Sequence, residues 1–303
     1  ITVPTDSTVV FELNTPDPHF MQKLATPLAA IYPREAVGDT PDEFNAVGAG
    51  PFRFSSREAD STLIFAKFQN YYDASEINLN RVDGVADASE SELFRQMGEG
   101  NIYFLPQLGP QIFGNILEPS GELTPSYRGR YNLQTTSGRT EYVLRHNPAA
   151  NLSTESAAFI SNQAQADTSY INRFPGNLVE SSFTADTSSD NLDEAMIADE
   201  IYSTFSQNPF IRTYLGSLSR RLQSYTTLQM IQIQAHSRST GLLFTVNYPL
   251  IPEARWDNYK PLYQFNVRQA ALLRNEIDGL KFNQYPWWLD LRGVMLPAAE
   301  ELN

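Results

Sequence analysis

The chain has 303 residues, of which 41% are hydrophobic and 12% aromatic, enough to build two lobes or one large mixed domain. Its 35 acidic and 22 basic side chains give a net charge of −13, which disfavours binding to nucleic acid or to an anionic membrane. Because cysteine is absent, the chain can form no disulfide and has no thiolate for catalysis or metal binding.

The first half of the chain predicts short strands and helices in alternation. Residues 8–13 are typical of a strand, and apolar residues at helical spacing predict a helix over residues 20–31. A glycine-rich turn at residues 47–54 leads into a strand, and residues 60–68 predict a strand buried on both faces. Further strands are expected at residues 82–85, 102–105 and 141–146, and a helix at residues 89–97.

In the middle of the chain, residues 153–174 have the spacing of a helix, and residues 176–191 are rich in Ser, Thr and Asp, which indicates a loop. Ile197, Ile201 and Phe205 recur at positions i, i+4 and i+8. They predict a helix that ends before Pro209.

The last third predicts strands. Residues 242–246 are typical of a buried strand, and residues 262–268 alternate between apolar and polar side chains. We expect residues 270–276 to continue that strand after a bend, although their helix propensity leaves a helix as the alternative. Strands mixed with helices indicate the α/β class, or a mixed α+β architecture.

No motif for catalysis or metal binding is recognisable. His19, His146 and His236 are far apart, and there is no zinc-protease, phosphate-loop or nucleophile-elbow pattern. The acidic clusters at residues 87–90 and 186–194 lack the spacing of a calcium loop and predict a solvated surface or a helix start. We therefore expect no enzymatic activity, no metal and no cofactor.

Aromatic side chains beside turns are better candidates for a binding site. Such rings can stack on a ligand, and they can equally cover the hydrophobic core. The candidate ligand-binding aromatics are Tyr71, Tyr72, Trp256, Trp287 and Trp288.

Several motifs occur in a characteristic order. Residues 16–20 read PDPHF, residues 31–37 read IYPREAV, residues 47–52 read VGAGPF, and residues 288–294 read WLDLRGV. In this order they resemble the family 5 extracellular solute-binding proteins of ABC transporters, the peptide- and nickel-binding group. Gly48, Gly50 and Pro51 form its most specific structural signature. We expect valine at Gly48 or Gly50 to damage folding, because glycine tolerates backbone angles that a β-branched residue does not.

The resemblance implies a partial two-lobed, periplasmic-binding-protein-like (type II) fold that lacks the N-terminal part of the first lobe. Residues 1–143 would lie in the first lobe, 144–250 in a shortened second lobe, and 251–303 again in the first. The segments that cross between lobes would lie near residues 142–147 and 247–256, which adds Asn247 and Tyr248 to the candidate ligand-binding residues.

The resemblance implies the substrate-binding component of an ABC importer. Such a protein would bind oligopeptides, or another small solute, between its lobes and deliver them to the permease subunits. It would be a monomer, periplasmic or extracellular, and tethered to a membrane through residues that precede Ile1. The chain itself has no apolar run long enough to span a bilayer and no signal peptide at its start.

Other functions stay open at this point. The same binding module is fused to a winged helix in some transcriptional regulators, where it senses a ligand. A signal peptide before Ile1 would favour transport, and a basic helix-turn-helix would favour regulation. An unrelated hydrolase and a remnant that binds nothing are the remaining alternatives.

Overall fold

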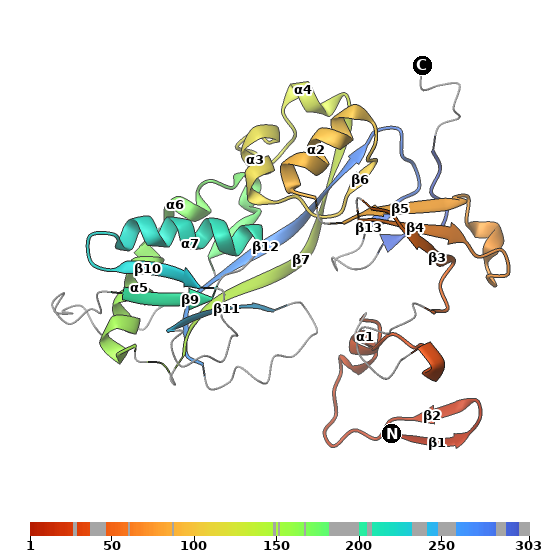
Figure 1. Cartoon of the computed structure of the whole chain (residues 1–303), viewed down its shortest axis with the longest axis horizontal. Helices are drawn as coiled ribbons and strands as arrows, with labels where there is room; N and C mark the ends of the chain where they lie inside the picture. The colour runs from red at the N-terminus through yellow and green to blue at the C-terminus, as the bar shows by residue number, and fades with distance from the viewer. Residues whose placement is uncertain are drawn as a thin grey trace. The chain divides into compact units, whose positions relative to one another are not determined.

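The computed structural model describes residues 1–26, 29–36, 47–59, 61–86, 88–147, 150, 152–166, 168–181, 200–204, 208–231, 241–247, 259–282 and 289–296. The chain divides into two compact units, Ile1–Ala49 and Gly50–Asn303 (Figure 1). None of the helices in these ranges has both the length and the apolar character needed to cross a membrane.

The first unit contains a hairpin and short helical turns. β1 (Thr2–Thr5) pairs antiparallel with β2 (Thr8–Val10), the confirmed part of the strand predicted at residues 8–13. α1 (Phe20–Leu24) is shorter than predicted, because the hydroxyl and the backbone N–H of Thr26 both donate to the carbonyl of Lys23 and close the helix. A 3₁₀ turn, η2 (Arg34–Ala36), follows.

A small antiparallel sheet begins the second unit. β3 (Phe52–Arg57), β4 (Thr62–Lys67) and β5 (Arg81–Val85) pair in this order, and η4 (Ala74–Glu76) precedes β5. The predicted strands are confirmed, but the expectation that β4 is buried on both faces is wrong. Only Thr62 and Ile64 are buried, as in an antiparallel sheet with one solvated face.

The glycine signature leads into β3, as predicted, but neither the backbone angles nor the surroundings of its glycines require glycine. Neither Gly48 nor Gly50 has a positive φ, and a Cβ built on either would meet no atom within 4 Å. The expectation that valine here damages folding therefore has no basis in the local backbone.

In the described part of the chain, seven strands form the main sheet, in the order β10, β9, β11, β7, β12, β6, with β8 beside β12. β9 runs parallel to β10 and β11, and the other pairs are antiparallel, so the sheet is mixed, as the predicted fold class requires. The strands are β6 (Phe104–Leu105), β7 (Tyr131–His146), β8 (Val179–Ser181), β9 (Glu200–Thr204), β10 (Thr227–Ile231), β11 (Leu242–Asn247) and β12 (Pro261–Arg274).

The long strands β7 and β12 connect the two ends of this sheet (Figure 1). β12 pairs with β8 through its first half and with β6 through its second half. Between the halves the register shifts: Arg268 lies opposite Arg139, and Ala270 opposite Thr135. This bend confirms that residues 270–274 continue the strand of residues 262–268.

Most predicted helices are confirmed. α2 (Glu90–Glu99) is capped by the Ser89 side chain, which accepts a hydrogen bond from the Glu92 N–H. α5 (Thr154–Ala166) and α6 (Thr168–Ile171) occupy the helix predicted at residues 153–174, and α5 packs against β12 and α7 (Pro209–Leu222). The remaining elements are α3 (Pro110–Ile116), α4 (Pro125–Arg128), η5 (Pro175–Asn177), β13 (Lys281–Phe282) and β14 (Leu289–Asp290).

Two predictions in the middle of the chain are wrong. The helix expected around Ile197, Ile201 and Phe205 is replaced at residues 200–204 by β9, which pairs residue by residue with β10. Part of the loop expected at residues 176–191 is the strand β8. In both places backbone pairing with a neighbouring strand decides the conformation, and local spacing does not.

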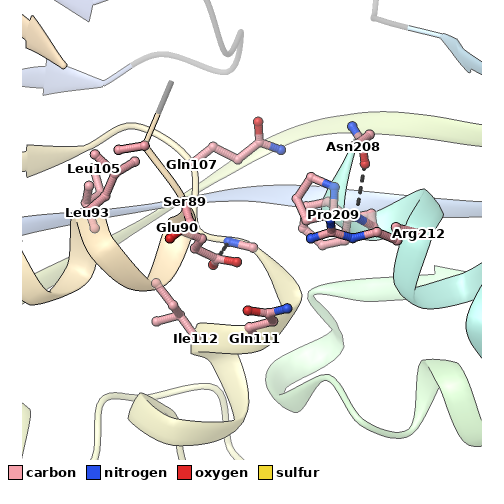
Figure 2. A pocket seen from close by; sticks show the side chains of 13 residues that line it. Ser89, Glu90, Leu93, Leu105, Gln107, Gln111, Ile112, Asn208, Pro209 and Arg212 are labelled. Atoms are coloured by element: carbon pink, nitrogen blue, oxygen red, sulfur yellow. Dashed lines mark hydrogen bonds between the residues drawn. The ribbon is translucent and has the colours of Figure 1, made fainter. Parts of the chain in front are cut away.

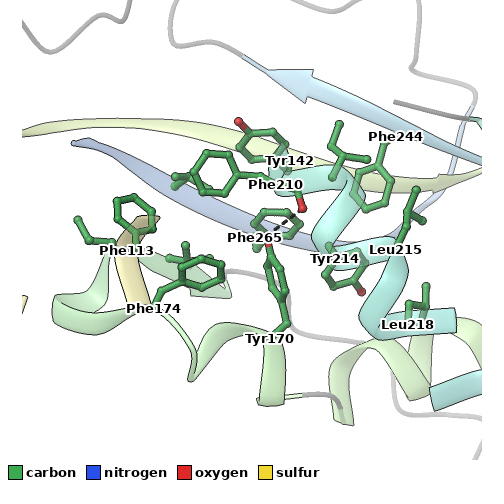
Figure 3. Close-up of a cluster of buried hydrophobic side chains, with 14 of the residues drawn as sticks. Phe113, Tyr142, Tyr170, Phe174, Phe210, Tyr214, Leu215, Leu218, Phe244 and Phe265 are labelled. Carbon is green, nitrogen blue, oxygen red and sulfur yellow. Dashed lines mark hydrogen bonds between the residues drawn. The ribbon is translucent and has the colours of Figure 1, made fainter. Parts of the chain in front are cut away.

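An aromatic core fills the space between the main sheet and α7 (Figure 3). The Phe265 side chain, fully buried on β12, stacks on Tyr142 of β7 with ring centroids 5.0 Å apart. The Phe265 ring also contacts Tyr214 of α7 and Tyr170 of α6, with centroids 5.3 and 5.2 Å away. The Tyr170 hydroxyl donates to the carbonyl of Phe210, which fixes the start of α7 to α6.

Candidate functional site

A cavity of about 660 Å3 lies where α2, α3 and α7 begin (Figure 2). Its size is within the range of small-ligand sites. One side is formed by the start of α2 and by the segment from β6 into α3, and the other side by the start of α7. The polar side chains that line it are Ser89, Glu90, Gln107, Gln111, Asn208 and Arg212.

Glu90 forms the acidic part of the first side. Its Oε1 accepts a hydrogen bond from the N–H of Gly109, the residue before α3. Its Oε2 is buried and has no hydrogen-bond partner among the residues that the structure describes. Burial raises the pKa of Glu90, although backbone N–H groups at the start of α3 act in the opposite direction. The sequence predicts a solvated residue or a helix start here. Glu90 does begin α2, but its carboxylate is directed at α3.

The raised pKa of Glu90 predicts a specific pH dependence. Folding disfavours the ionised carboxylate, so the folded protein holds this proton to higher pH than the unfolded chain does. We expect Glu90→Gln to gain stability relative to the wild type as the pH rises from about 4 to 8. Urea unfolding across that range measures the difference.

Glu92 is the matched control, on the same turn of α2. Hydrogen bonds from Arg95 and Gln96 lower the pKa of Glu92 to about 2. A lowered pKa contributes stability that is lost only in acid, so Glu92→Gln should show no gain between about pH 5.5 and 8. Parallel curves for Glu90→Gln and the wild type would contradict the raised pKa of Glu90.

The second side of the cavity is the first turn of α7. The Asn208 side-chain oxygen accepts hydrogen bonds from the N–H groups of Phe210 and Ile211, at 3.0 and 3.2 Å, and Pro209 is the first helical residue. Arg212 is exposed and has no ion-pair or hydrogen-bond partner for its side chain among the described residues. Figure 2 shows Asn208 and Arg212 across the cavity from Glu90 and Gln111.

The predicted ligand-binding residues that the structure describes do not line this cavity. Tyr71 and Tyr72 follow β4, with ring centroids 4.3 Å apart, and hydrogen bonding to Tyr72 raises the pKa of Tyr71 to about 12. Asn247 ends β11, and its amide donates to Glu141 Oε2 at 2.5 Å. Their role in binding stays a prediction. Tyr248, Trp256, Trp287 and Trp288 lie outside the described residues.

The cavity residues were recognisable only in part from the sequence. Ser89 and Glu90 are identifiable as a helix start, and Asn208 followed by Pro209 is an equally good start signal. Because the sequence predicts a helix that ends before Pro209, Arg212 lies in no predicted element. Gln107 and Gln111 give no local signal, since only the fold brings them opposite α7.

The fold is that of two-lobed periplasmic binding proteins. Similar solved structures include OppA of Haemophilus influenzae in complex with RPPGFSPFR, with a TM-score of 0.68, 10% identity and coverage of 93% of this chain and 72% of that one. AgaA of A. tumefaciens R10 with agropinic acid has a TM-score of 0.68 and 14% identity, over 94% and 75%. NikA of Brucella suis with Fe(III)-EDTA has a TM-score of 0.61 and 12% identity, over 87% and 72%.

A family model matches the first part of the chain, just under half of its length. Residues 1–148 match the model of the bacterial extracellular solute-binding proteins, family 5, middle region. No curated protein sequence matches the chain. The matched segment therefore belongs to family 5, and the predicted resemblance is confirmed. Its members are extracellular solute-binding proteins.

Proposed function

We propose that the chain is the substrate-binding component of an ABC importer and that its solute is an oligopeptide. The observation that carries the proposal is the polar-rimmed cavity at the starts of α2, α3 and α7, in a fold shared with solute-binding proteins. OppA, one of the similar structures, holds a nonapeptide, which supports this class of solute.

Binding would be coupled to a bend of the main sheet. β7 and β12 are continuous strands with a register shift between Arg268 and Ala270. We propose that they bend at this irregularity when the solute binds. A solute with higher affinity for the closed arrangement would shift the protein toward it. This process requires no bond to be made or broken in the solute, so we propose binding without catalysis.

Delivery would require the permease subunits of the importer as partners. The protein would act as a monomer outside the cytoplasm, tethered to the membrane through residues before Ile1. Closure around the solute would create the surface that the permease recognises.

Mass spectrometry of protein purified under native conditions tests the proposal. We expect co-purified peptides and, after their removal, an increase in melting temperature when a peptide pool is added back. An empty protein that shows no thermal shift with peptides, sugars or metal ions would contradict solute binding. Solute turnover that depends on His146 would contradict binding without catalysis.

A further inference from the structure

The sequence contains two Asp-Gly pairs, Asp83–Gly84 and Asp278–Gly279. In such a pair the backbone nitrogen of the glycine can attack the side-chain carboxyl carbon of the aspartate, because glycine has no Cβ to hinder the approach. The attack closes a small ring, so it requires the nitrogen and the carboxyl group to be in near-attack contact. The local structure of each pair therefore decides whether it reacts.

The backbone at Asp278–Gly279 brings these atoms together. The Gly279 N–H donates to Asp278 Oδ1 with a nitrogen–oxygen distance of 2.7 Å, so the nitrogen already contacts the carboxyl group that it would attack. Gly279 has a φ of 76°, and a Cβ at this position would collide with the carbonyl oxygen of Gly293. Asp278 is exposed, so water can reach it.

The backbone pairing of Asp278 leaves the reacting atoms free. Its N–H donates to the Met295 carbonyl at 3.2 Å, and its carbonyl accepts from the Met295 N–H at 3.0 Å. Neither of these hydrogen bonds uses the Gly279 nitrogen. The pairing with Met295 therefore holds Asp278 in place while the nitrogen stays beside the carboxyl group.

Asp83–Gly84 is the same dipeptide in a different setting. Both residues lie within β5 and pair with Ile64 and Leu63 of β4. Arg81 donates to both carboxylate oxygens of Asp83, at 2.6 and 2.8 Å, and Gly84 has no positive φ. Ring closure here would break the ion pair and displace the strand, so the fold should suppress the reaction.

We propose that Asp278 is a site of isoaspartate formation, a covalent modification of the folded protein. The Gly279 nitrogen forms a bond to Cγ of Asp278 and loses its proton, and the carboxyl hydroxyl leaves with that proton as water. Water then adds to the main-chain carbonyl of residue 278 in the cyclic imide, and the bond from that carbonyl carbon to nitrogen breaks. The main chain now runs through Cγ, and the former main-chain carbonyl is a free carboxylate.

The modification would alter the contacts of the C-terminal strands. Isoaspartate adds one carbon to the main chain between residues 278 and 279, so the pairing with Met295 and the close approach of Gly279 to Gly293 cannot both persist. The Gly293 N–H also donates to the carbonyl of Glu76 in η4, at 3.0 Å. We therefore expect the isomerised protein to melt at a lower temperature than fresh protein.

Peptide mapping by liquid chromatography and mass spectrometry tests the proposal. Trypsin releases residues 275–281 and 82–95 as separate peptides, so each Asp-Gly pair is followed by itself. Folded wild-type protein is incubated in mildly acidic buffer below its melting temperature. We expect isoaspartate to accumulate about 10- to 100-fold faster at residue 278 than at residue 83. Isoaspartyl methyltransferase labels the new carboxylate and identifies the isomer.

Protein unfolded in guanidinium provides the reference, because both pairs then lose their local structure. The two residues should isomerise at similar rates in that sample. Absence of isoaspartate at residue 278 in the folded wild type, or an equal rate at residues 83 and 278, would overturn the proposal. So would the same preference for residue 278 in the unfolded protein, because the sequence and not the fold would then cause it.

Asp278→Glu is the matched variant for the effect on stability. It keeps the negative charge, but its longer side chain would have to close a larger ring, so we expect no isomer at residue 278. Its melting temperature should stay constant during an incubation that lowers the melting temperature of the wild type. An equal decrease in both proteins would contradict the link between isoaspartate at residue 278 and the loss of stability.

Discussion

Replacing Phe265 with alanine is expected to lower the free energy of unfolding by about 3–5 kcal/mol. The ring is fully buried and contacts the rings of Tyr142, Tyr170 and Tyr214. Three elements meet there, β7, α6 and α7, so a smaller side chain leaves a cavity that none of them can close alone. Urea unfolding followed by circular dichroism measures the loss.

The same substitution should weaken solute binding. α7 carries Asn208 and Arg212 to the cavity, and its position depends on the contact between Tyr214 and Phe265. We therefore expect lower affinity for the peptide pool even at temperatures where the variant stays folded.

Phe54 is the control for the loss of a ring. It lies on β3, is 45% exposed, and has its ring centroid 5.9 Å from that of Phe65. Phe54→Ala should cost less than about 1.5 kcal/mol, because nearly half of the residue is already exposed to water. If both variants unfold at the same urea concentration, Phe265 does not have the central role assigned to it.

This core explains which elements the sequence predicts well. Tyr263, Phe265 and Val267 alternate with polar residues, and all three are buried. The alternation in the sequence therefore identifies the buried face of β12. Strand β11 is predictable for a related reason, since Leu242, Leu243 and Phe244 are all buried.

Elements held by long-range pairing give no such signal. The first half of β7 is polar, and it is a strand because it pairs with the second half of β12, more than a hundred residues away. β9 is a strand because β10 and β11 flank it, against the helical spacing of its apolar residues. The cavity also depends on long-range contacts, because α3 and α7 are distant in the sequence and come into contact only in the fold.

The glycines that a sequence motif singles out are also different from the glycines that the fold constrains. The sequence singles out Gly48 and Gly50, which lie in open space, whereas Gly121 and Gly176 approach each other closely across two loops. Both have positive φ, at 88° and 62°. A Cβ on Gly176 would lie 2.6 Å from the Cα of Gly121, and a Cβ on Gly121 would lie 2.7 Å from the Cα of Gly176.

Substituting Gly176 is therefore expected to damage folding severely. The positive φ of residue 176 is expected to cost Gly176→Ala about 1–3 kcal/mol. The new Cβ must also push the two loops apart, which breaks the hydrogen bond from the N–H of residue 176 to the Pro119 carbonyl. Melting temperature and urea unfolding measure the effect. Gly48→Ala and Gly50→Ala should remain within about 0.5 kcal/mol of the wild type.

Asparagine variants separate the cost of the positive φ from the cost of the steric clash between the loops. Asparagine tolerates a positive φ better than other side chains, so mainly the clash remains. Gly100, the C-cap of α2, also has a positive φ, but its Cβ would meet only the guanidinium end of Arg274, a flexible side chain. We expect Gly100→Asn to fold nearly normally and Gly176→Asn to be as damaging as Gly176→Ala, since backbone atoms of Gly121 cannot move aside. Equal stability of the two asparagine variants would mean that the loops are not in contact.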